Sequence, residues 1–133
     1  MKKNAITVTA TMNASPEELF NALTDAATIR QWSGQKGKVQ LKVGGTVELF
    51  DGWVKGVVLA FEPGKLLSHT WLPADWREGT KPSIVTYTLA KAKGGTKISL
   101  KHSGFPNHKE LQGHKTGWKE FVFDPLREYF GRK

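Results

Sequence analysis

The fold is decided by residues 107–131, which read NHKELQGHKTGWKEFVFDPLREYFG. At 100° per residue, this stretch places its large apolar side chains on one arc of a helix and most of its charged side chains outside that arc. The arc consists of Leu111, Trp118, Val122, Leu126 and Tyr129, with Phe121 and Pro125 along its edge. Asn107 is expected to cap the helix, and Gly131 to end it. We therefore predict a long, amphipathic C-terminal helix held in the grip of a sheet.

Two features of this helix lower its intrinsic stability and need a reason. Gly113 and Gly117 each cost about 1 kcal/mol relative to alanine. They indicate either a frayed first turn or a deliberate widening of a cavity between the helix and the sheet. Pro125 cannot donate a hydrogen bond to the carbonyl of Phe121, so a bend is expected between these two residues.

The chain upstream of this helix predicts one strand, two short helices and a meander. Apolar and polar residues alternate from Ile6 to Ala14, which is typical of a strand with one buried face. The run Ser15–Glu18 combines a cap, a first-turn proline and a capping-box acid, so a helix should begin at Pro16. A second helix, capped by Asp25, should end at Trp32. Six further strands are predicted at 39–43, 46–50, 53–61, 66–72, 83–90 and 96–102.

These elements predict an α+β fold of order β-α-α-β-β-β-β-β-β-α. A run of antiparallel strands followed by one long amphipathic helix requires a curved seven-stranded sheet wrapped around that helix. No repeat, linker or low-complexity segment interrupts the sequence, so residues 1–133 are expected to form a single domain.

The composition limits the classes of partner and compartment. The net charge of +8 raises the possibility of nucleic-acid binding, but the lysines are scattered, the arginines do not cluster and no nucleic-acid motif is present. No apolar run approaches the ~20 residues of a membrane span. The absence of cysteine suits a reducing compartment. We expect a cytoplasmic monomer that binds no nucleic acid.

The sequence does not identify a reaction. His69, His102, His108 and His114 do not have the spacing of a metal site, and neither a nucleophile signature nor a cofactor-binding motif is present. No catalytic residue, metal ligand or cofactor is therefore predicted. His102 alternates with Leu100 and Ile98, which favours a hydrogen-bonded core histidine over a general base.

Five tryptophans in 133 residues indicate either a strongly aromatic core or a cavity for an apolar ligand. The predicted ligand-binding residues are those expected on inward faces or at the cavity rim: Trp32, Trp53, His69, Trp71, Trp76, Tyr87, His102, Trp118, Phe121 and Val122. Trp76 lies in the polar loop from Pro73 to Pro82, where it either packs on its own loop or closes the cavity mouth as part of a lid. In the second case, Trp76→Ala should change stability by less than ~1 kcal/mol.

Several segments together resemble the START-like SRPBCC superfamily and, within it, the bacterial family similar to the activator of the heat-shock-protein-90 ATPase. The resemblance lies in residues 15–25 with Trp32, in Gly44-Gly45, in residues 56–58, in His69-Thr70-Trp71, in residues 96–105 and in Gly117-Trp118. It implies the helix-grip fold, with a cavity between the sheet and the C-terminal helix.

Fold alone does not choose among the roles known in this superfamily. The leading hypothesis is a binding module for a small apolar or lipid-like ligand. The first alternative is a heat-shock-protein-90 co-chaperone-like, stress-response protein with a chaperone as its partner. A polyketide-cyclase-like enzyme ranks third.

Overall fold

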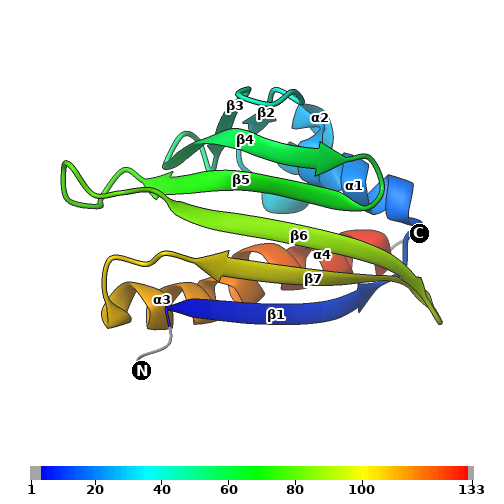
Figure 1. Ribbon diagram of the computed structural model, residues 1–133. Helices are drawn as coiled ribbons and strands as arrows, with labels where there is room; N and C mark the ends of the chain where they lie inside the picture. The colour runs from blue at the N-terminus through cyan, green and yellow to red at the C-terminus, as the bar shows by residue number, and fades with distance from the viewer. Residues whose placement is uncertain (1–3, 132–133) are drawn as a thin grey trace.

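The computed structural model describes residues 4–131. Its strands form one antiparallel sheet in the order β1-β7-β6-β5-β4-β3-β2, so that the first strand pairs with the last. The strands are β1 (Ala5–Met12), β2 (Lys38–Val39), β3 (Thr46–Leu49), β4 (Val54–Glu62), β5 (Leu66–Pro73), β6 (Ser83–Ala92) and β7 (Gly95–Ser103). All helices lie on one face of this sheet (Figure 1). The predicted α+β fold and its order of elements are confirmed.

Two short helices, α1 (Pro16–Thr24) and α2 (Ala26–Ser33), connect β1 to β2. The predicted capping box is present, since Glu18 N donates to Ser15 Oγ at 3.1 Å and Ser15 N donates to Glu18 Oε1 at 2.9 Å. Asp25 caps α2 by accepting from Thr28 N at 3.0 Å. Both helix starts thus follow from local hydrogen bonding that the sequence signals directly.

The β2–β4 region is less regular than predicted. The strand predicted at 39–43 is replaced by the two-residue β2, which contains only Val39 of that segment, because Gln40 and Lys42 already turn the chain through backbone hydrogen bonds. The reversal between β3 and β4 spans Phe50 to Trp53 and is wider than the two-residue turn predicted at Asp51-Gly52. These corrections leave the strand order unchanged.

The C-terminal helix is continuous but changes type along its length. It consists of α3 (His108–Trp118), a π-helical turn η1 (Lys119–Phe123) and α4 (Asp124–Gly131). Asn107 caps α3 as predicted, accepting from Glu110 N at 2.9 Å. In the π turn, Asp124 N donates to the carbonyl of Lys119, five residues earlier. The irregularity expected before Pro125 is therefore a π turn.

The π turn corrects the predicted apolar arc. Leu111, Trp118, Val122 and Leu126 are buried as predicted, but Tyr129 is only half-buried and Phe121 is 55% exposed. Phe123 and Phe130 are buried in their place. A π turn contains one extra residue, which rotates everything after it by about 100° relative to a regular α-helix. Phe130 therefore takes the orientation that an uninterrupted helix would give to Tyr129.

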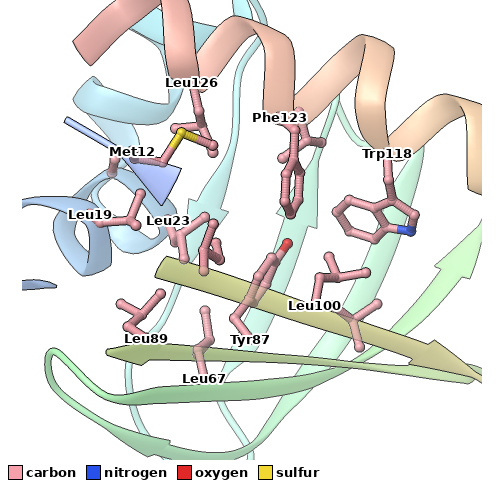
Figure 2. Close-up of a cluster of buried hydrophobic side chains, with 14 of the residues drawn as sticks. Met12, Leu19, Leu23, Leu67, Tyr87, Leu89, Leu100, Trp118, Phe123 and Leu126 are labelled. Atoms are coloured by element: carbon pink, nitrogen blue, oxygen red, sulfur yellow. The ribbon is translucent and has the colours of Figure 1, made fainter. Parts of the chain in front are cut away.

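The core lies between this helix and the inner face of the sheet. Figure 2 shows Trp118 and Phe123 pointing from the helix toward Leu100 and Tyr87 on the sheet. The predicted inward faces are confirmed, because all six residues concerned are buried: Val85, Tyr87, Leu89, Ile98, Leu100 and His102. Within residues 4–131, no helix is long and apolar enough to cross a membrane.

Candidate functional site

A pocket of about 430 Å³ opens between α3 and the turn that joins β3 to β4. Its helical wall is made by residues on one side of α3 and the π turn: Glu110, Gly113, His114, Gly117, Trp118, Phe121 and Val122. Gln35, Phe50, Trp53 and Trp71 complete it. Cavities of this size and aromatic character are typical of small-molecule sites.

The two glycines of α3 keep this pocket open. A Cβ atom at Gly113 would meet no heavy atom within 4 Å, and one at Gly117 would meet only Phe121 Cδ2, at 3.9 Å. The helix is regular through both positions. The geometry therefore agrees with the cavity interpretation of these glycines and not with a frayed turn.

The turn at the mouth holds two residues in an unfavourable backbone conformation. Phe50 and Asp51 have φ values of 52° and 58°, in the left-handed region that costs a non-glycine residue about 1–3 kcal/mol. Hydrogen bonds hold the turn: Asp51 N donates to Lys36 O at 3.0 Å, and Lys36 N donates to Asp51 Oδ1 at 2.7 Å. This arrangement presents the rings of Phe50 and Trp53 to the pocket.

A chain of hydrogen bonds fixes the polar side of the pocket. Trp71 Nε1 donates to His114 Nε2 at 3.1 Å, and His114 Nδ1 lies 2.9 Å from the carbonyl oxygen of Glu110. The indole can only donate and the carbonyl can only accept, so His114 carries its proton on Nδ1 and is neutral. The imidazole is held between the sheet and the helix as a fixed part of the wall.

A second chain lies deeper, behind the pocket. Trp118 Nε1 donates to His102 Nδ1 at 2.9 Å, and His102 Nε2 lies 2.8 Å from Ser83 Oγ. Ser83 Oγ in turn donates to the carbonyl of Trp71 at 2.9 Å, so His102 Nε2 is the donor to Ser83. Burial is the main cause that lowers the pKa of His102 to about 2, with smaller contributions from His114 and His69. His102 is thus a neutral, fully bonded core residue, and the general-base alternative has no free ring nitrogen to use.

His69 occupies the neighbouring strand in a similar state. Its Nδ1 donates to the carbonyl of Thr70 at 2.8 Å, and its ring stacks on Trp71 with 6.3 Å between centroids. Burial lowers the pKa of His69 and raises that of Tyr87, whose ring centroid lies 6.0 Å away. Both side chains fill the space under the middle of the helix, where they leave a void of only about 20 Å³. The centre of the grip is therefore packed, and the usable cavity lies at its α3 end.

Comparison with known proteins supports a family assignment for this architecture. The family model described as Activator of Hsp90 ATPase homolog 1-like protein matches residues 13–131. The chain belongs to this family. The match includes every residue of the pocket described above.

Relatives of this activator-like chain include proteins named for the activity. It is 27% identical over 126 residues to the mouse Activator of 90 kDa heat shock protein ATPase homolog 1, covering 95% of this chain and 37% of the mouse protein. The chain thus spans little more than a third of that relative's length. Among solved structures, the HSP90 activator from Plasmodium falciparum is 31% identical, with a TM-score of 0.86 and 97% coverage of both chains. A protein from Mesorhizobium loti is also 31% identical, with a TM-score of 0.83 and coverage of 97% of this chain and 98% of that one.

In this chain, the predicted ligand-binding residues fall into three groups. Five of them line the pocket: Trp53, Trp71, Trp118, Phe121 and Val122. Three others border only the small inner void: Trp32, His69 and Tyr87. His102 and Trp76 border neither space and are buried beside them. Five of the ten predicted residues therefore lie at this pocket, and the other five lie outside its lining.

Trp76 requires a correction. Its indole is only 9% exposed, donates from Nε1 to Glu110 Oε1 at 2.8 Å, and meets the His114 ring edge-on. It does not close the pocket mouth, and it packs on α3 and not merely on its own loop. Removing a buried tryptophan costs about 3–5 kcal/mol, so the loss of stability in Trp76→Ala is now expected to exceed the ~1 kcal/mol that the lid interpretation implied.

Trp32 has a structural role as well, because its Nε1 donates to the carbonyl of Ala22 at 2.7 Å and joins α2 to α1. Four residues that line the pocket were not predicted from the sequence: Gln35, Phe50, Glu110 and His114.

Glu110 and His114 lie one helical turn apart, on the same side of the helix as Gly113 and Gly117, and this spacing is the signal that could have identified them. Across residues 4–131, no group of three or more histidine, aspartate or glutamate side chains is placed to hold a metal ion.

Proposed function

We propose that this protein binds a small apolar ligand, with at least one aromatic ring, in the pocket between α3 and the β3–β4 turn. The observation that carries the proposal is a cavity of about 430 Å³ with aromatic walls. Two glycines of α3 line it, and each lowers helix stability relative to alanine, a cost that an open cavity would explain.

The rim of the pocket supports the same interpretation. Trp53 and Phe121 are 41% and 55% exposed, although large aromatic side chains gain free energy from burial. Both border the pocket, so a ligand lying between them would cover surface that the free protein leaves in water. The strained backbone at Phe50 and Asp51 fits this site, because such strain concentrates where a side chain must be presented to a ligand.

The shape of the free space favours a compact ligand over a long acyl chain. The region under the middle of the helix keeps only about 20 Å³, room for about one water molecule. A long chain would have to displace Tyr87 or His69, which are tightly packed. The ligand class proposed is therefore a ring of one or two cycles and not a lipid tail.

Titration with a library of small ring compounds, followed by backbone amide chemical shifts, tests this proposal. Binders should shift the amides of Gly113, Gly117 and Trp53. The matched control is Gly113→Leu, since leucine favours a helix and Gly113 lines the pocket, with no heavy atom within 4 Å of an added Cβ. This variant should fold and lose binding. Shifts confined to the outer face of the sheet, or binding unchanged in Gly113→Leu, would contradict the proposal.

A second candidate function is stimulation of a chaperone of the Hsp90 type. The observation that favours it is the similarity to the HSP90 activator from Plasmodium falciparum along almost the whole length of both chains. A chain with a net charge of +8 should approach an acidic partner surface, so stimulation should weaken as salt is added. The test is ATP turnover by purified Hsp90 with and without this protein at low and at physiological salt. Turnover that is unchanged at low salt would leave this candidate without support.

A further inference from the structure

The pocket contains a single charged group, and this group is acidic. Among the lining residues, all of which lie in the described part of the chain, Glu110 is the only carboxylate and neither lysine nor arginine occurs. His114 adds no positive charge, because the indole of Trp71 donates to its Nε2. A protein with a net charge of +8 thus has a binding cavity of the opposite sign.

We infer that the pocket selects aromatic ligands that carry a protonated amine and discriminates against aromatic carboxylates. This inference rests on the proposed function and specifies its ligand class. Two features of the pocket support this selectivity: the geometry of Glu110 and the arrangement of the rings around it.

The carboxylate of Glu110 is fixed and still able to bind a ligand. Its Oε1 accepts from Trp76 Nε1 at 2.8 Å, which holds the side chain in one orientation. The side chain remains 29% exposed, and an ionised carboxylate has about four lone-pair sites, so a second donor can be accepted. An ammonium group offers such a donor together with a positive charge, and this combination gives the stronger kind of hydrogen bond.

The rings favour a cation as well. Trp71 and Trp118 lie 4.8 Å apart between centroids, and Phe50 lies 6.4 Å from Trp71 and 6.3 Å from Trp53. Ring faces carry partial negative charge, so they attract an ammonium group placed over them and repel a carboxylate. A carboxylate in this pocket would meet ring faces and Glu110, with no cationic side chain in the lining to pair with it.

A further acidic group lies beside the pocket. Asp75 Oδ1 accepts from Trp53 Nε1 at 2.9 Å, so a carboxylate is held at the edge of a ring that lines the pocket. The Asp75 carboxylate therefore adds negative potential beside a lining ring without contacting the ligand itself.

Three probes with the same phenyl ring and two-carbon linker separate the contribution of charge from that of the ring. They are 2-phenylethylamine, 2-phenylethanol and 3-phenylpropionate, titrated at pH 7 with amide chemical shifts as the readout. The amine should bind about tenfold tighter than the alcohol, and the carboxylate at least about tenfold weaker than the alcohol. Equal affinity for all three probes would overturn the inference and leave the proposed function intact.

The variant Glu110→Gln sharpens the test. Glutamine keeps an oxygen that can accept from Trp76, so the fold and the ring pocket should be preserved. The advantage of the amine over the alcohol should fall from about tenfold to less than about threefold, while the affinity for the alcohol stays the same. Glu120→Gln is the matched control, because it removes the same charge from an exposed position of the same helix outside the pocket lining. It should keep the tenfold preference.

These outcomes distinguish a failure of the proposed function from a failure of the inference about Glu110. If none of the probes binds, and ring compounds in general do not bind, both the proposed function and the inference are wrong. If the probes bind but Glu110→Gln and Glu120→Gln behave alike, the pocket is real and the assigned role of Glu110 is wrong.

Discussion

The two halves of the C-terminal helix differ in how tightly their side chains are packed. In the C-terminal half, Phe123, Leu126 and Phe130 are all buried, and the helix packs on β1 and α2. In the N-terminal half, α3 buries only Leu111 and Trp118 and leaves a cavity beside two glycines. One half thus supplies stability, and the other gives up packing in order to keep space open.

The π turn between them makes this division possible. A regular helix presents one continuous stripe, whereas η1 rotates α4 relative to α3 and lets each half face its own neighbours. Packing free energy lost at one end of a helix can therefore be compensated at the other end of the same element. Functional sites commonly give up stability in this way.

Breaking the packed half should have the largest effect. Leu126 is fully buried, so Leu126→Ala should lower the free energy of unfolding by about 3 kcal/mol through lost contacts and the cavity left behind. Urea unfolding followed by circular dichroism measures it, and the pocket amides should keep their shifts below the transition. A loss under ~1 kcal/mol would mean that α4 is not the stabilising half.

The boundary between the halves should respond next. Trp118→Phe removes the indole donor to His102 Nδ1 and leaves this buried acceptor without that partner, at a cost of about 2 kcal/mol. The control is Trp53→Phe, because Trp53 bonds to Asp75 at the surface and is 41% exposed. This control should change the free energy of unfolding by less than about 0.5 kcal/mol. Equal effects in the two variants would contradict the role assigned to the buried chain.

Acid should weaken the core beneath the helix. The folded-state pKa of His102 is lowered to about 2 while the unfolded value is 6.5, so the unfolded state takes up the proton first as the pH falls. The free energy of unfolding is therefore highest above the unfolded pKa and declines as the pH falls below it, by on the order of 1 kcal/mol at pH 5.5 for this residue. His69 acts in the same direction, since its pKa is also lowered.

Urea unfolding at pH 7.5 and pH 5.5 measures this decline. The variant His102→Gln should lose part of it, whereas His108→Gln, at an exposed position, should retain all of it. A pH dependence that is identical in the two variants would show that His102 does not contribute.

Adding a side chain in the N-terminal half of the helix should have the smallest effect, and it should stabilise the protein instead of destabilising it. Gly113→Ala adds a methyl group in open space within a helix, so the free energy of unfolding should rise by about 0.5–1 kcal/mol. Gly34→Ala is a suitable comparison, because Gly34 ends α2 with φ +77° and alanine there should lower stability. A loss of stability at Gly113 would mean that the glycine has a packing role that its surroundings do not show.

The features predicted correctly from the sequence depend on short-range patterns. The capping box at Ser15, the cap at Asn107 and the alternation along β6 and β7 are each determined by residues a few positions apart. Period and capping chemistry are sufficient to place such elements.

The features missed depend on contacts between distant segments. Nothing in the letters around Phe50 indicates a positive φ, because that conformation is imposed by hydrogen bonds to Lys36. The π turn was missed for the same reason. Helix periodicity alone favours burial of Tyr129, whereas in the folded protein Phe123 and Phe130 are buried instead. Trp76 was misassigned because its partner, Glu110, lies 34 residues away.

The pairing of β1 with β7 determines when this sheet can be completed. Ala5 lies opposite Ser103 and Met12 opposite Thr96, so the first strand has no partner until nearly the whole chain is available. Closing so long a loop is entropically unfavourable before its contacts form, and folds with such non-local pairing reach the native state slowly. During synthesis, β1 must wait with both edges unpaired while β4, β5 and β6 pair with their neighbours in sequence. The hydroxyl-bearing alternate residues Thr7, Thr9 and Thr11 keep one face of the waiting strand polar, which limits its association with other unfinished chains.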